Sequence, residues 1–454
     1  MYSSKIVVFL VSLILVQVVW TSRVGVPVYV MLPLNTLSNG GDLTDVQLLQ
    51  SQLSQLKSQT GIEGVMSDVW WGIVETQPQV YNWTGYEALF NVIQQNELKV
   101  KVTMSFHECG GNVGDDCAIT LPQWVLNVGQ SNPNIFYTDQ QGNRDQEYLS
   151  LGVDDQPLFG GRTPIEIYSD YMASFYENFK DLIPSVIQEI QVGLGPAGEM
   201  RYPSYQSSLW TFPGIGEFQC YDKYMLANLA QAAEDAGNSD WGYAGPDDAG
   251  TYDSTPSQTG FFSQGTQDNY QSPYGQFFLN WYSGLLLEHG NKTLAEAKKV
   301  FGSSGVTVTA KVAGIHWWYL DPSHAAELAA GYKNDLGVAY YQIAQMFSWH
   351  NVSFDFTCLE MRDSEQPSNC ECGPQQLVAQ TLLSAESAGV KYSGENALQR
   401  YDSTAYQEIE IESSLYYLIS GFSYLRLTPQ LLQSPNIGTF ASFVQTMSTL
   451  QGPN

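Results

Sequence analysis

Acidic residues and paired tryptophans stand close to the ends of several short apolar segments of this chain. One Trp-Trp pair, at 70–71, follows Asp68, and a second, at 317–318, follows His316. Indole rings pack on the C–H faces of sugars, and carboxylates form paired hydrogen bonds with polar groups. These residue types in this pattern are typical of a carbohydrate site.

Two glutamates fit the chemistry of glycosidic bond cleavage. That reaction needs one protonated carboxyl to protonate the leaving oxygen and one ionised carboxylate as base or nucleophile. Glu199 and Glu395 each directly follow a glycine, which lets the backbone turn and aim the side chain. We expect these two residues to be the catalytic pair.

Other polar residues gather at the ends of the apolar segments. They are Asp68, His107, Glu108, Lys311, His316, Thr357, Glu360, Arg362, Asn396 and Arg426. Three of these features have an alternative interpretation. A glutamate at a strand end fits a salt bridge, a tryptophan pair fits core packing, and His316 fits a buried imidazole with its hydrogen bonds satisfied.

The elements that must position these residues form an alternating pattern. Eight β-rich runs occur at 26–32, 62–70, 98–106, 186–194, 306–315, 352–359, 390–394 and 420–427. Helical periodicity occurs between most of them, at 46–60, 83–95, 164–182, 323–349 and 374–388. Strands alternating with helices predict a parallel sheet, and eight of them predict an α/β fold of the closed (β/α)8 TIM barrel type. An open doubly wound sheet is the alternative, but residues 35–41 lack its glycine-rich turn.

The predicted domain organisation is a signal peptide over residues 1–22 and a single barrel catalytic domain over 23–454. Residues 196–275 are rich in Gly, Pro, Ser, Asp and Tyr and show little periodicity, and loops this long are usually functional. In a barrel the βα loops carry the active site, so we expect long βα loops to form an active-site lobe.

The composition excludes several classes of protein. The chain has 454 residues, 19 Lys+Arg, 46 Asp+Glu and a formal net charge of -27. Phosphate backbones and anionic lipids repel such a chain, so we expect no nucleic-acid partner and no membrane partner after signal removal. A content of 43% hydrophobic and 13% aromatic residues excludes intrinsic disorder. We take a monomer as the default.

The N-terminal segment predicts the compartment. Lys5 precedes a nearly uninterrupted apolar stretch over 6–20, which is short for a membrane span and suits a signal peptide, with an uncleaved signal anchor as the alternative. We therefore expect a secreted protein or one in the lumen of an endomembrane compartment, a lysosome or vacuole. Sequons at Asn82, Asn291 and Asn351 fit that route.

Six cysteines allow 15 complete pairings, so the count alone leaves the connectivity open. Cys109 and Cys117 flank a glycine-rich loop and are spaced to close a short ring, whereas Cys370 and Cys372 are too close for an easy internal disulfide. No set of histidines and cysteines has a convincing metal-ligand spacing. We expect no metal and no cofactor.

Seven segments together resemble the β-amylase family, glycoside hydrolases that remove maltose from the non-reducing ends of starch. The resemblance covers about residues 26–430 in GVMSDVWWGIVE at 64–75, FHECGGNVGDDC at 106–117, GRTPIEIYSDYM at 161–172, GLGPAGEMRYPSY at 193–205, KVAGIHWWY at 311–319, FTCLEMRDSEQ at 356–366 and SGENAL at 393–398. It implies a TIM barrel, an inverting mechanism, and starch, glycogen-like glucans and maltodextrins as substrates.

The resemblance also implies a role for each matching residue. Glu199 matches the general acid and Glu395 the general base. Asp68 and His107 match the positions that grip the terminal glucose, and Asp115 lies on a mobile lid over 110–116. Lys311 and His316 match contacts on the reducing side of the scissile bond, and Thr357 matches an inner-loop threonine. Three further contacts are matched by Asn396, Ala397 and Arg426.

Two departures from the family pattern bear on the lid. Glu108 stands where the family more often has glutamine. We expect its carboxylate to face solvent, and the alternative is that it shifts the pH optimum. Cys109 and Cys117 resemble the paired lid cysteines of secreted bacterial relatives, which implies a disulfide. Two other functions remain open: another barrel amylase that retains configuration, and a catalytically inactive glucan-binding relative.

Overall fold

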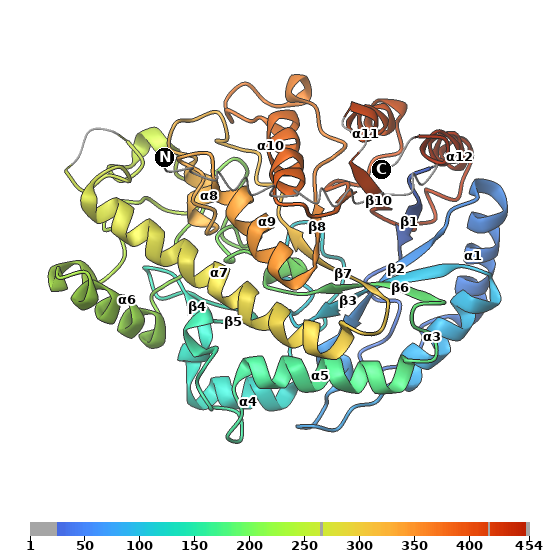
Figure 1. Ribbon diagram of the computed structural model, residues 1–454, viewed down its shortest axis with the longest axis horizontal. Coiled ribbons are helices and arrows are strands. Elements are labelled where there is room, and N and C mark those ends of the chain that lie inside the picture. Colours follow the sequence, from blue (N-terminus) through green and yellow to red (C-terminus); the bar gives the residue numbers. More distant parts are fainter. Residues whose placement is uncertain (1–24, 264–266, 416–417, 451–454) are drawn as a thin grey trace, which may run out of the picture.

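Residues 25–263, 267–415 and 418–450 are described by the computed structural model. The predicted signal peptide over 1–22 lies outside these residues. A bundle of parallel strands runs through the middle of the molecule with helices around it, and the first strand lies beside the last (Figure 1).

The eight β-rich runs form the predicted closed parallel barrel. Its strands pair in the order β1-β10-β9-β8-β7-β6-β3-β2, and β1 pairs in parallel with both β2 and β10. They are β1 (Val28–Met31), β2 (Gly64–Trp70), β3 (Lys99–Ser105), β6 (Ile187–Val192), β7 (Thr307–Val312), β8 (Ser353–Phe356), β9 (Tyr392–Glu395) and β10 (Ile419–Tyr424). The TIM barrel prediction is confirmed.

The helices around the strands follow from amphipathic sequence with explicit end signals. In α1 the Asp45 side chain accepts a hydrogen bond from the Leu48 amide, and Gly61 ends the helix with φ 73°. The helices are α1 (Val46–Thr60), α2 (Trp71–Val74), α3 (Thr84–Gln95), α4 (Gln123–Ser131), α5 (Pro164–Phe179), α6 (Lys223–Asp235), α7 (Pro273–Phe301), α8 (Ala325–Ala329), α9 (Ala339–His350), α10 (Pro374–Ser387), α11 (Ser403–Leu415) and α12 (Asn436–Met447).

The barrel interior is polar on the side chains that point inward. On β3, Lys101 forms an ion pair with Glu189 of β6 at 3.1 Å, and the Thr103 hydroxyl donates to the Gln191 side chain at 3.2 Å. The alternate β3 residues Val100, Val102 and Met104 are fully buried, and α3 packs against this strand. The core therefore has an apolar layer between strands and helices and a hydrogen-bonded layer inside the barrel.

Two expectations about the elements are wrong. The helical pattern over 323–349 forms two helices, α8 and α9, because Gly331 and Gly337 take positive φ values of 97° and 70° and turn the chain between them. The aperiodic segment 196–275 contains a full helix, α6, which begins where the Asp222 side chain caps the Tyr224 and Met225 amides. Figure 1 shows α6 at the edge of the molecule, outside the ring of helices.

A small antiparallel pair, β4 (Phe136–Thr138) and β5 (Arg144–Leu149), lies outside the barrel. A further expectation is wrong at Cys370 and Cys372, which form a disulfide. Their Cα atoms are 5.1 Å apart, inside the usual range for a disulfide, because Glu371 between them has φ 44° and turns the chain. No helix within the described ranges combines the length and apolar content of a membrane span.

Candidate active site

One large cavity opens at the carboxyl ends of the barrel strands, where TIM barrels carry their chemistry. Its volume is about 830 Å³, within the range of small-molecule sites. Glu360 and Arg362, two further polar residues at strand ends, do not line it. The eleven residues to which the family resemblance gives a role all do, namely Asp68, His107, Asp115, Glu199, Lys311, His316, Thr357, Glu395, Asn396, Ala397 and Arg426. The structure thus brings together residues that are up to 358 positions apart in the sequence.

Glu199 is placed by the loop that follows β6. Ala197 and Gly198 have φ values of 53° and 72°, a sharp left-handed turn that directs the next side chain into the cavity. The Met200 amide then donates to the Lys311 carbonyl of β7 at 2.8 Å, which fixes the loop to the barrel. Glu199 as a residue is 9% exposed, and its carboxylate accepts a hydrogen bond from Arg201 Nε at 2.6 Å.

Glu395 is the last residue of β9, so the barrel itself holds its backbone. Its side chain is buried, Lys311 Nζ lies 3.7 Å from Oε2, and Oε1 accepts no hydrogen bond from the described residues. Burial raises the pKa of Glu395 well above its usual range, the adjacent Asp355 carboxyl adds to this, and Lys311 opposes it.

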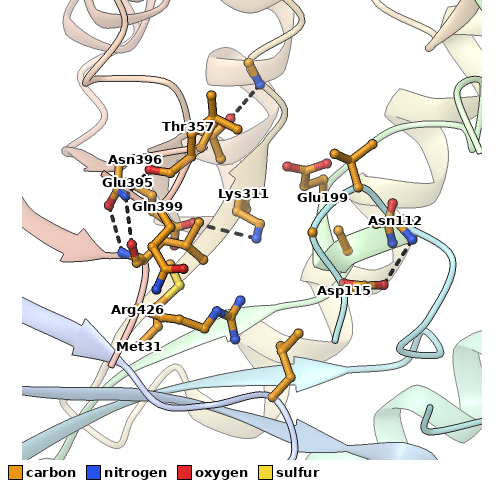
Figure 2. A pocket seen from close by; sticks show the side chains of 18 of the residues that line it. Met31, Asn112, Asp115, Glu199, Lys311, Thr357, Glu395, Asn396, Gln399 and Arg426 are labelled. Atoms are coloured by element: carbon orange, nitrogen blue, oxygen red, sulfur yellow. Dashed lines mark hydrogen bonds and ion pairs between the residues drawn. The ribbon is translucent and has the colours of Figure 1, made fainter. Parts of the chain in front are cut away.

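The two glutamates occupy opposite walls of the cavity, and Figure 2 shows the Lys311 side chain between them. Burial alone would lower the pKa of Lys311, but the carboxylates of Glu395, Glu199 and Asp68 outweigh it and raise that pKa. An ammonium group whose charged form is favoured therefore stands between the two carboxyl groups. Such a pair of carboxyls can act as an acid and a base on opposite sides of a bond.

Asp68 and His107 form the part of the wall nearest β2 and β3. Asp68 Oδ1 accepts a hydrogen bond from Ser105 Oγ at 2.8 Å, and burial raises the pKa of Asp68. Burial lowers the pKa of His107 to about 3, so its imidazole is neutral. The ring packs edge-on against Trp70, and its Nδ1 has no partner among the described residues, which leaves a nitrogen for a ligand hydroxyl.

A lid over residues 110–116 covers one side of the cavity. Cys109 and Cys117 at its base form the expected disulfide. One carboxylate oxygen of Asp115, Oδ2, accepts hydrogen bonds from the Gly110 and Asn112 amides at 2.8 and 3.0 Å. This oxygen holds the turn of the lid, and the Asp115 side chain lines the cavity.

Glu108 differs from the expectation that it faces solvent. It is partly buried, and burial, together with Asp145 and Asp115, raises its pKa to about 7. Its amide donates to the Glu147 carbonyl of β5 at 2.8 Å, and this backbone contact holds the residue against that strand. Glu108 does not line the cavity.

Aromatic rings make up the outer wall beside His316. Phe212 lies 6.0 Å and Trp317 5.6 Å from the His316 ring, measured between centroids, and Trp210 and Tyr205 continue the wall. His316 Nδ1 is 3.1 Å from the Gly314 carbonyl, and burial lowers the pKa of His316. Only the Trp-Trp pair signalled this wall in the sequence; the other rings lie in the aperiodic segment 196–275.

The remaining predicted residues are on the loops after β8, β9 and β10. The Thr357 hydroxyl accepts a hydrogen bond from the Gly314 amide at 2.7 Å. The Asn396 side chain donates to the Leu398 and Leu425 carbonyls, and so joins the loop that carries Ala397 to the end of β10. Arg426 donates to the Leu32 carbonyl at 3.2 Å and lines the cavity floor (Figure 2).

Several residues at the site escaped prediction because their importance depends on distant partners. Arg201 donates to Glu199 and lies over the Tyr205 ring, and all three residues are on the loop after β6. Asn112 on the lid accepts a hydrogen bond from Arg201, and Glu147 on β5 accepts one from the Ala197 amide. Asp355 of β8 is fully buried beneath Glu395. A carboxylate inside an otherwise apolar strand was the one available sequence signal for Asp355.

Comparisons with known proteins agree with this geometry. The family model for glycosyl hydrolase family 14 matches residues 29–452. A beta-amylase of Vigna unguiculata is 52% identical over 435 residues, covering 93% of this chain and 87% of the relative. Beta-amylase 1, chloroplastic, of Arabidopsis thaliana is 48% identical over 436 residues, covering 93% and 76%.

A solved structure gives the same result in three dimensions. The catalytic domain of beta-amylase from Paenibacillus polymyxa superposes with a TM-score of 0.77 at 30% sequence identity, covering 93% of this chain and 98% of that one. The barrel, the matched residue range and the identity of these relatives lead to one assignment. The chain belongs to glycosyl hydrolase family 14.

Proposed function

We propose that this protein is a β-amylase, an exo-acting hydrolase that inverts configuration, cleaves α-1,4-glucosidic bonds of starch and maltodextrins from their non-reducing ends and releases β-maltose. The observation that carries the proposal is the placement of two buried carboxyls, Glu199 and Glu395, on opposite walls of one cavity with Lys311 between them. The named beta-amylases among its relatives support it.

In this mechanism Glu199 is the general acid. Arg201 holds its Oε2, so Oε1 is the oxygen that carries the proton and delivers it to the glycosidic oxygen. Protonation lets the reducing-side glucan depart as a neutral alcohol. His316 and the aromatic wall beside it would bind that departing part of the chain.

Glu395 is the general base that activates water on the opposite face of the sugar ring. Its unpartnered Oε1 is available to accept a proton from that water, while Lys311 lies beside Oε2 and favours the ionised form. Water attacks the anomeric carbon as the leaving oxygen is protonated, so the configuration inverts and no covalent intermediate forms.

Substrate would be gripped at its non-reducing end by Asp68 and His107. Asp115 would close over it with the lid, Thr357 would hold the displaced glucose after cleavage, and Asn396, Ala397 and Arg426 would supply the remaining contacts. Closure excludes bulk water from the reacting bond and leaves the attacking water beside Glu395. A pocket that ends two sugar units beyond the scissile bond would accept a chain end and release a disaccharide.

The proposal extends to the state and location of the protein. We take it to be a monomer that acts on starch, glycogen-like glucans and maltodextrins. A secreted or lumenal location, in a lysosome or vacuole, is supported by the apolar stretch at 6–20, by the exposed sequon asparagines Asn82 and Asn351, and by the lid disulfide, since disulfides persist in oxidising compartments.

The test is proton NMR of fresh product from maltopentaose. We expect β-anomeric maltose to appear first with the wild type, and Glu199→Gln and Glu395→Gln each to lower kcat by about 10²–10⁴-fold. Glu234→Gln, an exposed glutamate of α6, is the matched control and should keep wild-type turnover. An initial α-anomer would contradict inversion, and maltose binding without turnover would indicate a glucan-binding protein instead.

A further inference from the structure

The lid touches the anchor of the general acid directly, through one side chain. Asn112 Oδ1 accepts a hydrogen bond from an Arg201 terminal nitrogen at 2.7 Å, and the same guanidinium donates from Nε to Glu199 at 2.6 Å. Asn112 lies near the middle of the lid, whose two ends are joined by the disulfide. A lid residue and the proposed acid are therefore separated by a single guanidinium group.

The nitrogen of the Asn112 side-chain amide also forms a hydrogen bond. Its Nδ2 donates to Glu147 Oε1 of β5, and the same oxygen accepts the Ala197 amide at 2.8 Å. Ala197 is two residues before Glu199 on the turn that aims it. Asn112 thus connects to the acid by two routes, through the Arg201 guanidinium to the carboxylate and through Glu147 to the backbone of the turn.

The remaining contacts of Arg201 come from its own loop. Its other terminal nitrogen donates to the Tyr202 carbonyl at 3.2 Å, and its guanidinium lies 4.2 Å over the Tyr205 ring. Asn112 is the contact that belongs to a separate, closing segment. A buried guanidinium needs its hydrogen bonds satisfied, so removing this acceptor frees Arg201 to reorient and carry Glu199 with it.

A second lid contact avoids the acid. The Gly111 carbonyl accepts hydrogen bonds from the Ser207 amide and hydroxyl at 3.2 and 2.9 Å. Ser207 therefore helps to seat the lid without touching Arg201 or Glu147. The two contacts allow lid seating and acid positioning to be separated by mutation.

We propose that Asn112 is a positioning residue that aims the general acid only when the lid is closed. Closure over the substrate supplies the amide that fixes Arg201, and Arg201 in turn fixes the carboxyl of Glu199. Proton delivery is then coupled to enclosure of the glucan end. The inference rests on the proposed function, because it assigns Glu199 the role of acid.

A comparison of two substrates tests this role. Maltopentaose needs its leaving oxygen protonated, whereas α-maltosyl fluoride loses fluoride with little help from an acid and still needs Glu395 and a closed lid. For Asn112→Ala we expect kcat on maltopentaose to fall by about 10–100-fold and kcat on the fluoride by less than about 3-fold. Turnover of the fluoride also shows that the variant is folded.

Two further variants sharpen the result. Asn112→Asp keeps an acceptor for Arg201. Its loss of kcat on maltopentaose should therefore be closer to its loss of kcat on the fluoride than is the case for Asn112→Ala. Ser207→Ala weakens only lid seating, so it should affect both substrates by the same factor.

Equal losses on the two substrates for Asn112→Ala, or no loss on either, would overturn the inference. A wild-type protein that turns over neither substrate would overturn the proposed function instead.

Discussion

Asp355 is the side chain that most strongly raises the pKa of the proposed base, Glu395. Its carboxyl accepts hydrogen bonds from the Ser393 hydroxyl and from Gln191 Nε2, the latter at 2.8 Å, and contacts Glu395 inside the barrel. Charged groups on the neighbouring strands are Lys101, Glu189 and Lys311. Two carboxyls share one buried site, which disfavours ionisation of the base.

We expect Asp355→Asn to shift the acid limb of the kcat/KM profile to lower pH. Asp355 raises the pKa of Glu395, so its neutral replacement lowers that pKa and keeps the base ionised in more acidic solution. The profile should be measured with a maltodextrin substrate. Glu189→Gln is the comparison, because it removes a carboxylate of the same cluster that lies beside Lys101 and not beside Glu395; an identical shift in both variants would refute a direct effect of Asp355.

At the residue scale the sequence predicted eleven of the residues that line the cavity, because each stands at the carboxyl end of a strand or matches a family motif. It did not predict the buried partners. Asn112, Glu147 and Arg201 matter through hydrogen bonds between segments 35 to 89 residues apart. Such pairings follow from loop conformations that no local pattern encodes.

At the element scale, Glu327 holds two helices together across a turn. It is fully buried in α8 and contacts His324, Asn334 and Tyr340, the last of which lies in α9. The Asn334 side chain also exchanges hydrogen bonds with Gln380 of α10. One carboxylate thus organises the break that divides the predicted helix over 323–349.

We expect Glu327→Ala to destabilise the protein by about 3 kcal/mol, because it leaves buried polar partners unsatisfied. The measurement is the free energy of unfolding from urea titration. Glu327→Gln keeps a hydrogen-bonding group of the same shape and should lose less. Equal losses in the two variants would show that the charge of Glu327, rather than its hydrogen bonds, stabilises the turn.

The positions of the elements could largely be predicted, and their interruptions could not. Six of the eight predicted runs contain the observed strand, and the runs at 390–394 and 420–427 each miss one end residue, because buried parallel strands are short, β-branched and bounded by polar residues. The helix over 323–349 was wrong because apolar periodicity continues across the Gly331 turn. Helix α6 was missed because it lies within a long segment rich in Gly, Pro, Ser, Asp and Tyr, and it buries only Met225, Leu229 and Ala233.

At the scale of the whole molecule, buried carboxyls make stability depend on pH. Burial raises the pKa of each of Glu108, Glu217, Glu360 and Glu412 to about 7, from an ordinary value of 4.5. Between these two values the folded state binds more protons than the unfolded state. The free energy of unfolding therefore falls as pH rises through this window and levels off above it. Repulsion among the negative charges, with a net charge of -27 at pH 7, also lowers the free energy of unfolding as pH rises.

We expect the melting temperature to be highest in mildly acidic buffer and to fall between about pH 5 and about pH 7.5. Scanning calorimetry at a series of pH values measures this. Glu412→Gln, on α11 and outside the cavity, should reduce the fall because it removes one of the four groups. A melting temperature that rises steadily through this range would contradict the account.

The disulfide at the base of the lid also determines what happens when the chain is cut. Val113 at the tip of the lid is 60% exposed, which makes this loop accessible to proteases. Cleavage anywhere between Cys109 and Cys117 leaves two fragments joined through sulfur. A nicked molecule therefore migrates as one piece on a non-reducing gel and separates into two only after a thiol is added, with the cut ends still tethered over the cavity until then.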